Sequence, residues 1–516
     1  MNLRLLVETV SHLRLTQIVY QVWYKMYHPR FKECVSPIDS VDVSLLPCID
    51  KYHSQDGDSL TFLNIKDEFS GWNTTVHGML WAYNLNYMEW LCQKDMVQAE
   101  GERWIDRFME DLPSHHIGLD AAPTALRCTN WMKFFMKYPA SATKVRLDAL
   151  YGQIQLLSKK LEFHLLANHL LEDAFCLFFA SVFFADERLY RKASLLLERQ
   201  LREQILPDGA HYEQSPMYHC IMLDRLLDCY NISKNNQRFS GQEAFNDVMK
   251  RVAEQMLGHL ESIVYADGSI PLLNDSAQGI APVPSDLFAY AQRLGINYHP
   301  VPLRECGYRK METEGVEAVV DIGNITATYQ PGHTHADTFS YELRIDGQPI
   351  VLDTGISTYD KTPRRQYERG TLAHNTVSVD GCDSSRVWGG FRVGHRAKVS
   401  VLNDEPCCVK ASHDGFGHNR VHTRRVALDD SGFHVEDTVS GVGKWVSYIH
   451  LAPSVKVVLS EQEPGQILLG KHKFIVLGST RIDIEKNTVA TEYNRLENID
   501  VLAIHFDKQL SYTIIR

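Results

Sequence analysis

The stretch that decides the fold reads Gly332-His333-Thr334-His335-Ala336-Asp337, then Asp353-Thr354-Gly355, then Ala373-His374-Asn375-Thr376-Val377. Between the first two segments, residues 339–345 are apolar at every second position, which is the period of a β-strand. Asp346-Gly347 then predicts a tight turn, and residues 349–353 predict a returning strand. The stretch therefore predicts an antiparallel hairpin that carries Asp353 back toward His335.

The histidines of this stretch form a candidate cluster. His333 and His335 lie two residues apart, so on an extended backbone their side chains point to the same face. His374 follows Asp353 by 374 − 353 = 21 residues and precedes a strand-like Thr-Val-Ser-Val. Two imidazoles and a carboxylate from neighbouring strands can hold a metal ion with an open position. The alternative is that each histidine is a hydrogen-bonded structural residue.

The sequence on either side divides into a helical part and a β part. From about Glu314 to the end, many short segments of period 2 alternate with Gly, Asp and Asn turns, which predicts an antiparallel β-sandwich over residues 313–516. Before residue 300, apolar residues recur at helical spacing, with expected helices after Asn168 and at 190–205, 220–230 and 242–263. Helix pairs without alternating strands predict an all-α domain over residues 1–300. The fold class is therefore α+β and multidomain, with the boundary near residues 294–313.

Residues 1–70 are expected to be an N-terminal extension of short helices and loops. The apolar residues Leu3, Leu6 and Val10 could share one helical face, and a similar pattern continues through Ile18 and Val22. Basic residues are interspersed among them, namely Arg4, Arg14, Lys25, Arg30 and Lys32. These either contact an anionic partner or form an ordinary solvated helix face.

Composition narrows the functional classes. The chain has 516 residues, with 44% hydrophobic and 23% charged, as in globular proteins with ample cores. A formal net charge of −11 argues against a general nucleic-acid binder. It leaves room for a local basic groove that binds an acidic glycan, because fields focus in clefts.

Cysteines and hydropathy bear on the compartment. The 11 cysteines include no C-x-x-C pair, which fits a reducing compartment better than a disulfide framework. Charges interrupt the N-terminal apolar residues, so no signal peptide is expected, and no stretch is apolar enough to span a bilayer. We expect a cytoplasmic protein, or a periplasmic one if a leader was removed.

Two polar and aromatic regions of the helical part supply candidate binding residues. Residues 81–90 interleave aromatic rings with amides, including Tyr83 and Asn84, as sugar-binding grooves do; helix packing would look similar. Arg127 could pair with a carboxylate through two hydrogen bonds. The loop at residues 206–219 is dense in polar side chains, among them Gln214, and precedes a helix, where binding groups gather.

Three motifs together resemble the heparinase II/III superfamily of polysaccharide lyases, with its heparinase III-like branch closest. They are Asn168-His169-Leu170-Leu171-Glu172, the loop from Asp208 through Tyr218-His219, and the His333, Asp353 and His374 segments already quoted. The resemblance runs from about Trp72 to Ser400. It implies an incomplete (α/α) toroid followed by an antiparallel β-sandwich, with the active site in the cleft between them.

The resemblance also implies a reaction and roles. The family cleaves uronic-acid glycans by β-elimination, leaving a 4,5-unsaturated uronate, so an acidic polysaccharide is the expected partner. Asn168, supported by His169, would neutralise the substrate carboxylate, and Tyr218 and His333 would be the acid and base. Another tyrosine, either Tyr359 or Tyr367, is catalytic in some branches, and we assign Tyr367. The implied ligands of a structural divalent metal, expected to be zinc, are His335, Asp353 and His374.

Some features depart from the family pattern or are compatible with a purely structural role. Asn86 stands where a histidine is expected, and relatives that degrade extracellular glycans carry export signals. Asn168 could simply cap a helix, and Tyr218 could pack within one. Two other functions remain open: a non-haem iron oxygenase, whose iron site also uses His and Asp ligands on a β-sandwich, and a non-catalytic protein of glycan binding or polysaccharide assembly. The sequence does not distinguish heparan-like, alginate-like and capsular uronates.

Overall fold

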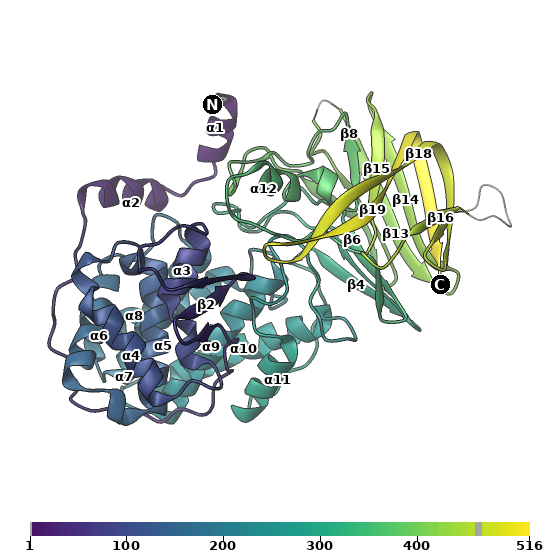
Figure 1. The fold of residues 1–516 in the computed structure, drawn as a ribbon. Helices are drawn as coiled ribbons and strands as arrows, with labels where there is room; N and C mark the ends of the chain where they lie inside the picture. Colours follow the sequence, from purple (N-terminus) through teal and green to yellow (C-terminus); the bar gives the residue numbers. More distant parts are fainter. Residues whose placement is uncertain (1–2, 418, 460–466) are drawn as a thin grey trace.

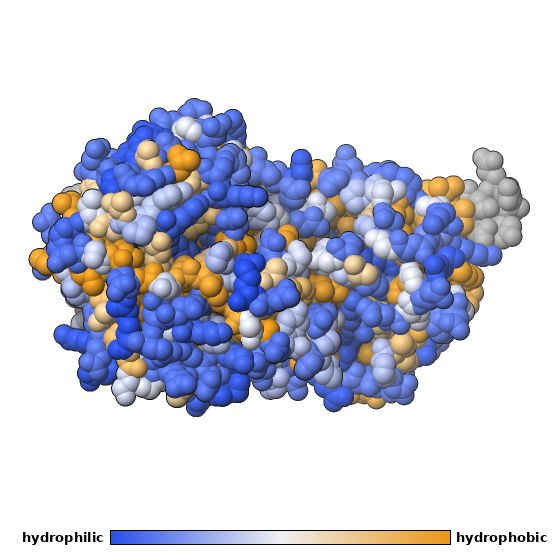
Figure 2. Space-filling model, turned by 90° about the horizontal axis from the view of Figure 1, so that it is seen from below, coloured by the Kyte–Doolittle hydropathy of each residue, from blue (hydrophilic) through white to orange (hydrophobic). Residues whose placement is uncertain are grey.

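The computed structural model describes residues 3–417, 419–459 and 467–516, and it shows a helical lobe joined to a β-rich lobe (Figure 1). The face seen in Figure 2 is mostly hydrophilic, with apolar residues scattered over both lobes. No helix in the described part of the chain is long and apolar enough to cross a membrane.

The helical lobe is built from α-helices around one large apolar core. Their bounds are α3 Met79–Tyr87, α4 Gln98–Glu110, α5 Ala121–Lys137, α6 Lys144–Leu157, α7 Ala167–Phe183, α8 Glu187–Gln204, α9 Pro216–Asn235, α10 Gln242–Ile263 and α11 Pro284–Arg293. The central helix, α7, is buried along nearly its whole length, and from Ala174 onward its sequence is apolar on all sides apart from Ser181. It packs on α5, α8 and α9, which is the pairing expected of a toroid of helical hairpins.

The N-terminal extension contains more β-structure than expected. Helices α1 (Leu3–Val10) and α2 (Leu15–Met26) are followed by a small antiparallel sheet of β1 (Gln55–Asp56), β2 (Ser59–Phe62) and β3 (Ile65–Glu68). The expectation of helices and loops alone was therefore wrong for this segment. Its turn has positive φ at both Leu63 and Asn64, and tertiary contacts hold it: the Asn64 amide donates to the carbonyl of Tyr493, 2.8 Å away in the other lobe.

The β-rich lobe is an antiparallel sandwich, as predicted. One sheet has the order β4-β5-β6-β7, with bounds Tyr308–Thr313, Val316–Asp321, Tyr341–Ile345 and Gln348–Val351. The larger sheet has the order β11-β12-β13-β14-β19-β18-β17-β16, with bounds Val399–Glu405, Cys408–His413, Val421–Asp429, Gly432–Ser440, Arg495–Ile515, His472–Glu492, Ile467–Leu469 and Val457–Leu459. β15 (Trp445–His450) joins β19 to β8 (Val377–Val379). The sheets share one core, in which the hydroxyls of Tyr341 and Tyr512 lie 3.1 Å apart.

The predicted hairpin is present and positions the chemistry. Strands β6 and β7 pair antiparallel, and their turn has positive φ at Asp346 and Gly347, as a tight hairpin requires. The returning strand delivers Asp353 to Ser340, whose hydroxyl donates to the carboxylate at 3.1 Å. Later in the chain, α12 (Pro363–Glu368) is followed by a separate two-stranded sheet of β9 (Val387–Trp388) and β10 (Arg392–Val393).

The lobes meet along a polar junction. The last helix of the first lobe ends at Arg293, and the sandwich begins at Tyr308. Within the segment between α10 and α11, Asn274 donates to the carbonyl of Gln214 at 3.0 Å and accepts from the backbone N–H of His335 at 2.8 Å. One side chain thus ties the loop before α9 to the histidine segment of the sandwich.

Candidate active site

A buried carboxylate, Glu213, brings the predicted site residues together. One of its oxygens accepts the backbone N–H of Asn168 at 2.9 Å, and the other bonds Nδ1 of His333. Glu213 is only 2% exposed; burial raises its pKa, but the His333 and His211 imidazoles and the hydrogen bond from Asn168 together outweigh burial, so the net pKa lies below the ordinary value. The side chain is therefore an anion that links the helical lobe to the sandwich.

Tyr218 lies on the same histidine. It sits in the first turn of α9, where Ser215 caps the helix, and its ring stacks on His333 with centroids 3.8 Å apart and planes 19° apart. Its hydroxyl is 3.1 Å from the hydroxyl of Tyr359. Burial raises the pKa of Tyr218 well above its usual value, so the phenol keeps its proton at neutral pH.

The sequence did not decide whether Tyr359 or Tyr367 belongs to the site, and the two tyrosines differ in their contacts. Tyr359 faces Tyr218, whereas the hydroxyl of Tyr367 accepts a hydrogen bond from Asn487 at 2.6 Å, and its ring lies beside Arg364. No contact within the described part of the chain joins Tyr367 to Tyr218 or His333. These contacts favour Tyr359 as the tyrosine of the site, and the catalytic role of Tyr367 stays a prediction.

Asn168 does not cap its helix. α7 begins at Ala167, so Asn168 is its second residue, and both Leu166 and Ala167 have positive φ. Such strained backbone persists where tertiary contacts over-determine it, often at functional sites. The Asn168 side chain is 8% exposed, and its amide has no hydrogen-bond partner among the residues described. The amide is free to bind a ligand.

His169 follows on the same turn. Its Nδ1 is 3.3 Å from a carboxylate oxygen of Glu162. Burial lowers the pKa of His169, but the carboxylates of Glu162, Glu213 and Glu172 together outweigh burial, so the net pKa is above the ordinary value. An imidazole that holds its proton more readily, next to Asn168 in the sequence, suits a site for an anion.

Two of the predicted binding residues are buried and bond other groups of the protein. Arg127 is 0% exposed: it donates to Gln153 at 2.8 Å and to the carbonyl of Asn86 at 3.0 Å, and burial lowers its pKa to about 10. Gln214 is buried and donates to the carbonyls of Cys306 and Asn324, at 2.7 and 3.0 Å. These bonds link the loop before α9 to Cys306 and Asn324, and the roles of Arg127 and Gln214 in substrate binding stay predictions.

The other two lie on α3 and are half-buried. The hydroxyl of Tyr83 donates to Asp120 at 3.2 Å, and its ring lies 6.3 Å from that of Tyr87. The amide of Asn84 donates to the carbonyl of Leu80 in its own helix, at 2.8 Å. Their role in substrate binding stays a prediction.

The side chains of the predicted metal ligands are buried, and in each of them only one of the two possible ligand atoms makes a hydrogen bond to a described residue. His335 bonds Asp275 at 2.7 Å, and His374 bonds Asp353 at 2.8 Å. Each also has one atom with no hydrogen-bond partner in the described residues: Nδ1 of His335, Nε2 of His374 and Oδ1 of Asp353. The imidazole rings lie 5.2 Å apart. Unpartnered buried nitrogen and oxygen atoms of this kind fit a divalent metal.

The distances between possible metal-ligand atoms point to a different group of residues. Within the described ranges, Asp208, His259 and Cys306 are the one set of such side chains whose ligand atoms all lie within 4.8 Å of one another. Asp208 already accepts two backbone N–H groups, from Arg304 and Cys306, at 3.0 and 2.9 Å. A buried group that could hold a metal is thus present, but it is not the set that the sequence predicted.

Sequence reasoning also missed residues that organise the site. Asp275 bonds His335 and pairs through both carboxylate oxygens with Arg365, whose guanidinium lies 5.1 Å from the centre of the Tyr359 ring. Asp275 has no sequence signal apart from its polar neighbours in a proline-rich segment. Glu213 did have one, because it lies in the polar loop before α9.

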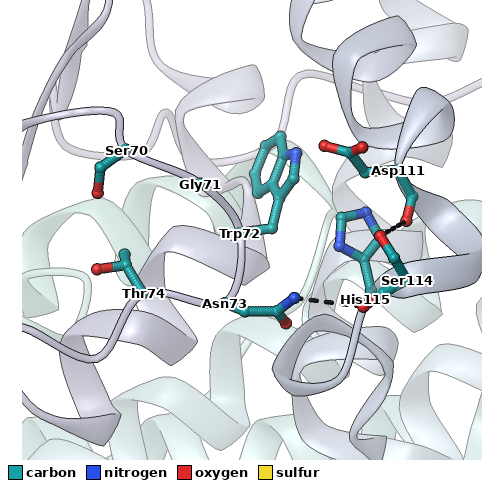
Figure 3. Close-up of a pocket in the computed structure, with 8 residues that line it drawn as sticks. All are labelled: Ser70, Gly71, Trp72, Asn73, Thr74, Asp111, Ser114 and His115. Atoms are coloured by element: carbon teal, nitrogen blue, oxygen red, sulfur yellow. Dashed lines mark hydrogen bonds between the residues drawn. The ribbon is translucent and has the colours of Figure 1, made fainter.

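The helical lobe also carries a surface hollow of about 450 Å³, between residues 70–74 and 111–115 (Figure 3). Asn73 donates across it to the carbonyl of Ser114 at 3.3 Å. Its lining includes none of Asn168, Tyr218 and His333. We assign the chemistry to the junction of the lobes and not to this hollow.

A helical toroid and an antiparallel sandwich with polar residues convergent at their junction define the architectural class. The protein family described as "Heparinase II/III N-terminus" matches residues 141–292, and the family described as "Heparinase II/III-like, C-terminal" matches residues 296–516. The chain belongs to the heparinase II/III family. This membership disfavours the iron-oxygenase alternative.

Individual relatives agree with the family. A heparin-sulfate lyase of Pedobacter heparinus is 26% identical over 241 residues, a match that covers 41% of this chain and only 36% of the relative. The crystal structure of a heparinase III has a TM-score of 0.66 at 16% identity and covers 84% of this chain and 76% of its own. A heparan sulfate lyase mutant from Pedobacter heparinus has a TM-score of 0.62 at 16% identity, with coverage of 97% and 87%. These structures confirm the toroid-and-sandwich fold.

Proposed function

We propose that the protein is a polysaccharide lyase that cleaves a uronate-containing glycan by β-elimination. The observation that carries the proposal is the convergence of Asn168, Tyr218 and His333 around Glu213. Family membership supports it, and so does the similarity to a protein named heparin-sulfate lyase. The substrate class is an acidic, uronate-bearing polysaccharide or oligosaccharide.

The reaction explains the types of residue present. The C5 proton of a uronate is only feebly acidic, and its removal builds negative charge onto the adjacent carboxylate. Groups that neutralise this charge stabilise the transition state more than the ground state, and they lower the barrier. We assign this role to the unpartnered amide of Asn168 and to His169, whose pKa is raised by Glu162.

Proton transfers follow from the hydrogen bonds. If Nδ1 of His333 donates to Glu213, Nε2 presents its lone pair and can take the C5 proton. The C5–H electrons form the C4=C5 double bond as the C4–O4 bond breaks. Tyr218, protonated at neutral pH because burial raises its pKa, donates its proton to the departing O4. Its partner Tyr359 positions this phenol.

The direct test uses a panel of heparan-like, alginate-like and capsular uronate polysaccharides. We expect at least one to give the ultraviolet absorbance of an unsaturated uronate with the wild type. Tyr218→Phe, which removes the acid, should lower turnover by roughly 100-fold or more. A folded Tyr218→Phe variant with full turnover would contradict our role for Tyr218. No ultraviolet product on any substrate would favour a non-catalytic glycan-binding or assembly protein.

A matched pair of variants tests the choice between the two tyrosines. Tyr359→Phe removes the hydroxyl that contacts Tyr218, and we expect turnover to fall by about tenfold or more. Tyr367→Phe removes a hydroxyl that, among the described residues, is bonded to Asn487 and not to Tyr218, and turnover should stay close to that of the wild type. Initial rates on the best substrate of the panel measure both. The reverse order of effects would restore Tyr367 as the site tyrosine.

We further propose that His335, Asp353 and His374 hold a structural divalent metal, with zinc expected for two imidazoles and a carboxylate. The unpartnered Nδ1, Nε2 and Oδ1 atoms of these residues support the assignment. When bound, the ion would supply positive charge that joins the strands behind His333. Asp208, His259 and Cys306 are the competing set.

Metal content distinguishes the two sets. By elemental analysis of purified protein, we expect bound zinc in the wild type and in Cys306→Ala, and its loss in His374→Ala. A chelator should lower the melting temperature of the wild type, because metal binding free energy contributes to folding. Loss of zinc in Cys306→Ala but not in His374→Ala would move the site to the competing set.

A further inference from the structure

Helix α2 presents an apolar face to solvent. Its outward residues Leu15, Val19, Val22, Trp23 and Met26 are between 47% and 75% exposed. Leu15, Val19, Val22 and Met26 follow the spacing i, i+4, i+7 and i+11, so they form one stripe along the helix. Soluble helices normally turn such a stripe toward a core, and a contiguous exposed apolar patch marks an interaction site.

The opposite face of α2 packs against the rest of the protein. Gln17 is buried and donates to the carbonyls of Leu165 and Tyr329, at 3.2 and 3.4 Å. Tyr20 packs on Phe163 with ring centroids 4.7 Å apart, and the hydroxyl of Tyr24 donates to the carbonyl of Leu161. These contacts fix the rotation of the helix. The apolar stripe cannot fold back onto the helical lobe.

The neighbouring helix α1 is held by the other lobe. Glu8 pairs with Arg386 at 3.1 Å, and the hydroxyl of Thr9 accepts from the indole of Trp388 at 3.0 Å. Figure 1 shows α1 and α2, in purple, at the upper edge of the molecule, with α1 reaching toward the β-rich lobe. The helix pair is a fixed arm and not a loose tail.

The charge of this arm is opposite to that of the whole protein. Residues 3–32 contain Arg4, Arg14, Lys25, Arg30 and Lys32 but only one acidic residue, Glu8, so their formal charge is 5 − 1 = +4 against −11 for the chain. Arg4 and Arg14 pair with Glu8 and Glu203. Lys25, Arg30 and Lys32 are exposed and make no ion pair with any residue that the structure describes.

We propose that α2 and its basic flank seat the protein on an anionic lipid surface. An exposed apolar stripe with a tryptophan, bordered by unpaired basic residues, has the chemistry of a helix that lies in the bilayer interface. With only 12 residues, α2 lies along the surface and does not span the bilayer. A second copy docked stripe to stripe would bring two basic flanks together, so charge favours anionic lipid headgroups as the occupant.

Vesicle co-sedimentation of the full chain tests the proposal. The vesicles are equal parts phosphatidylglycerol and phosphatidylcholine, or phosphatidylcholine alone. We expect binding to the anionic vesicles that weakens as salt is added, and little binding to the neutral ones. Val19→Glu combined with Trp23→Glu should weaken binding by about tenfold or more, because charges replace two lipid-buried side chains.

The control places the same charges elsewhere. Leu195 and Val442 are 70% and 89% exposed but lie outside the arm, so Leu195→Glu combined with Val442→Glu should bind like the wild type. Melting temperatures verify that both double variants are folded. Absence of wild-type binding to anionic vesicles, or equal loss in the control, would overturn the proposal. So would a dimer, by light scattering, that only the Val19→Glu, Trp23→Glu variant disrupts, because the stripe would then bind a second copy.

Discussion

The structure of the site depends on one buried carboxylate whose two oxygens bond residues from different lobes of the protein. Glu213 accepts the backbone N–H of Asn168 from the helical lobe and bonds the imidazole of His333 from the sandwich. A buried carboxylate is costly unless both oxygens are satisfied, so the loop before α9, the start of α7 and the histidine segment must stay in register. Stacking of Tyr218 on His333 extends the same constraint to α9.

The buried ion pair of Asp275 and Arg365 supports this arrangement. Asp275 accepts from both Arg365 and His335, and Arg365 in turn lies beside the ring of Tyr359. Arg365 and His335 hold the pKa of Asp275 well below its usual range despite burial, so this group stays ionised. Tyr359 thereby gains a fixed position opposite Tyr218. The tyrosine beside the acid is thus positioned by a buried ion pair.

The sequence predicted the elements that have local signals. Alternating apolar residues and the Asp346-Gly347 turn were sufficient for the β6–β7 hairpin, and helical spacing was sufficient for α7. It does not contain the contacts that tertiary structure decides. Arg127 and Gln214 carry groups that could bind a sugar, and nothing local reveals that they bond buried carbonyls instead. The choice of Tyr359 over Tyr367 depends on contacts with residues more than a hundred positions away, which spacing alone does not contain.

The most direct test of the account is the turnover of Glu213→Gln on the substrate that the wild type cleaves best, with Glu203→Gln as control. The glutamine can still accept from Asn168, but its amide N–H would face Nδ1 of His333. The ring would then carry its proton on Nε2, and it could not act as base. The account predicts that kcat/KM falls by roughly 100-fold or more in Glu213→Gln and stays near the wild-type value in the control. A folded Glu213→Gln protein with full kcat/KM would contradict it.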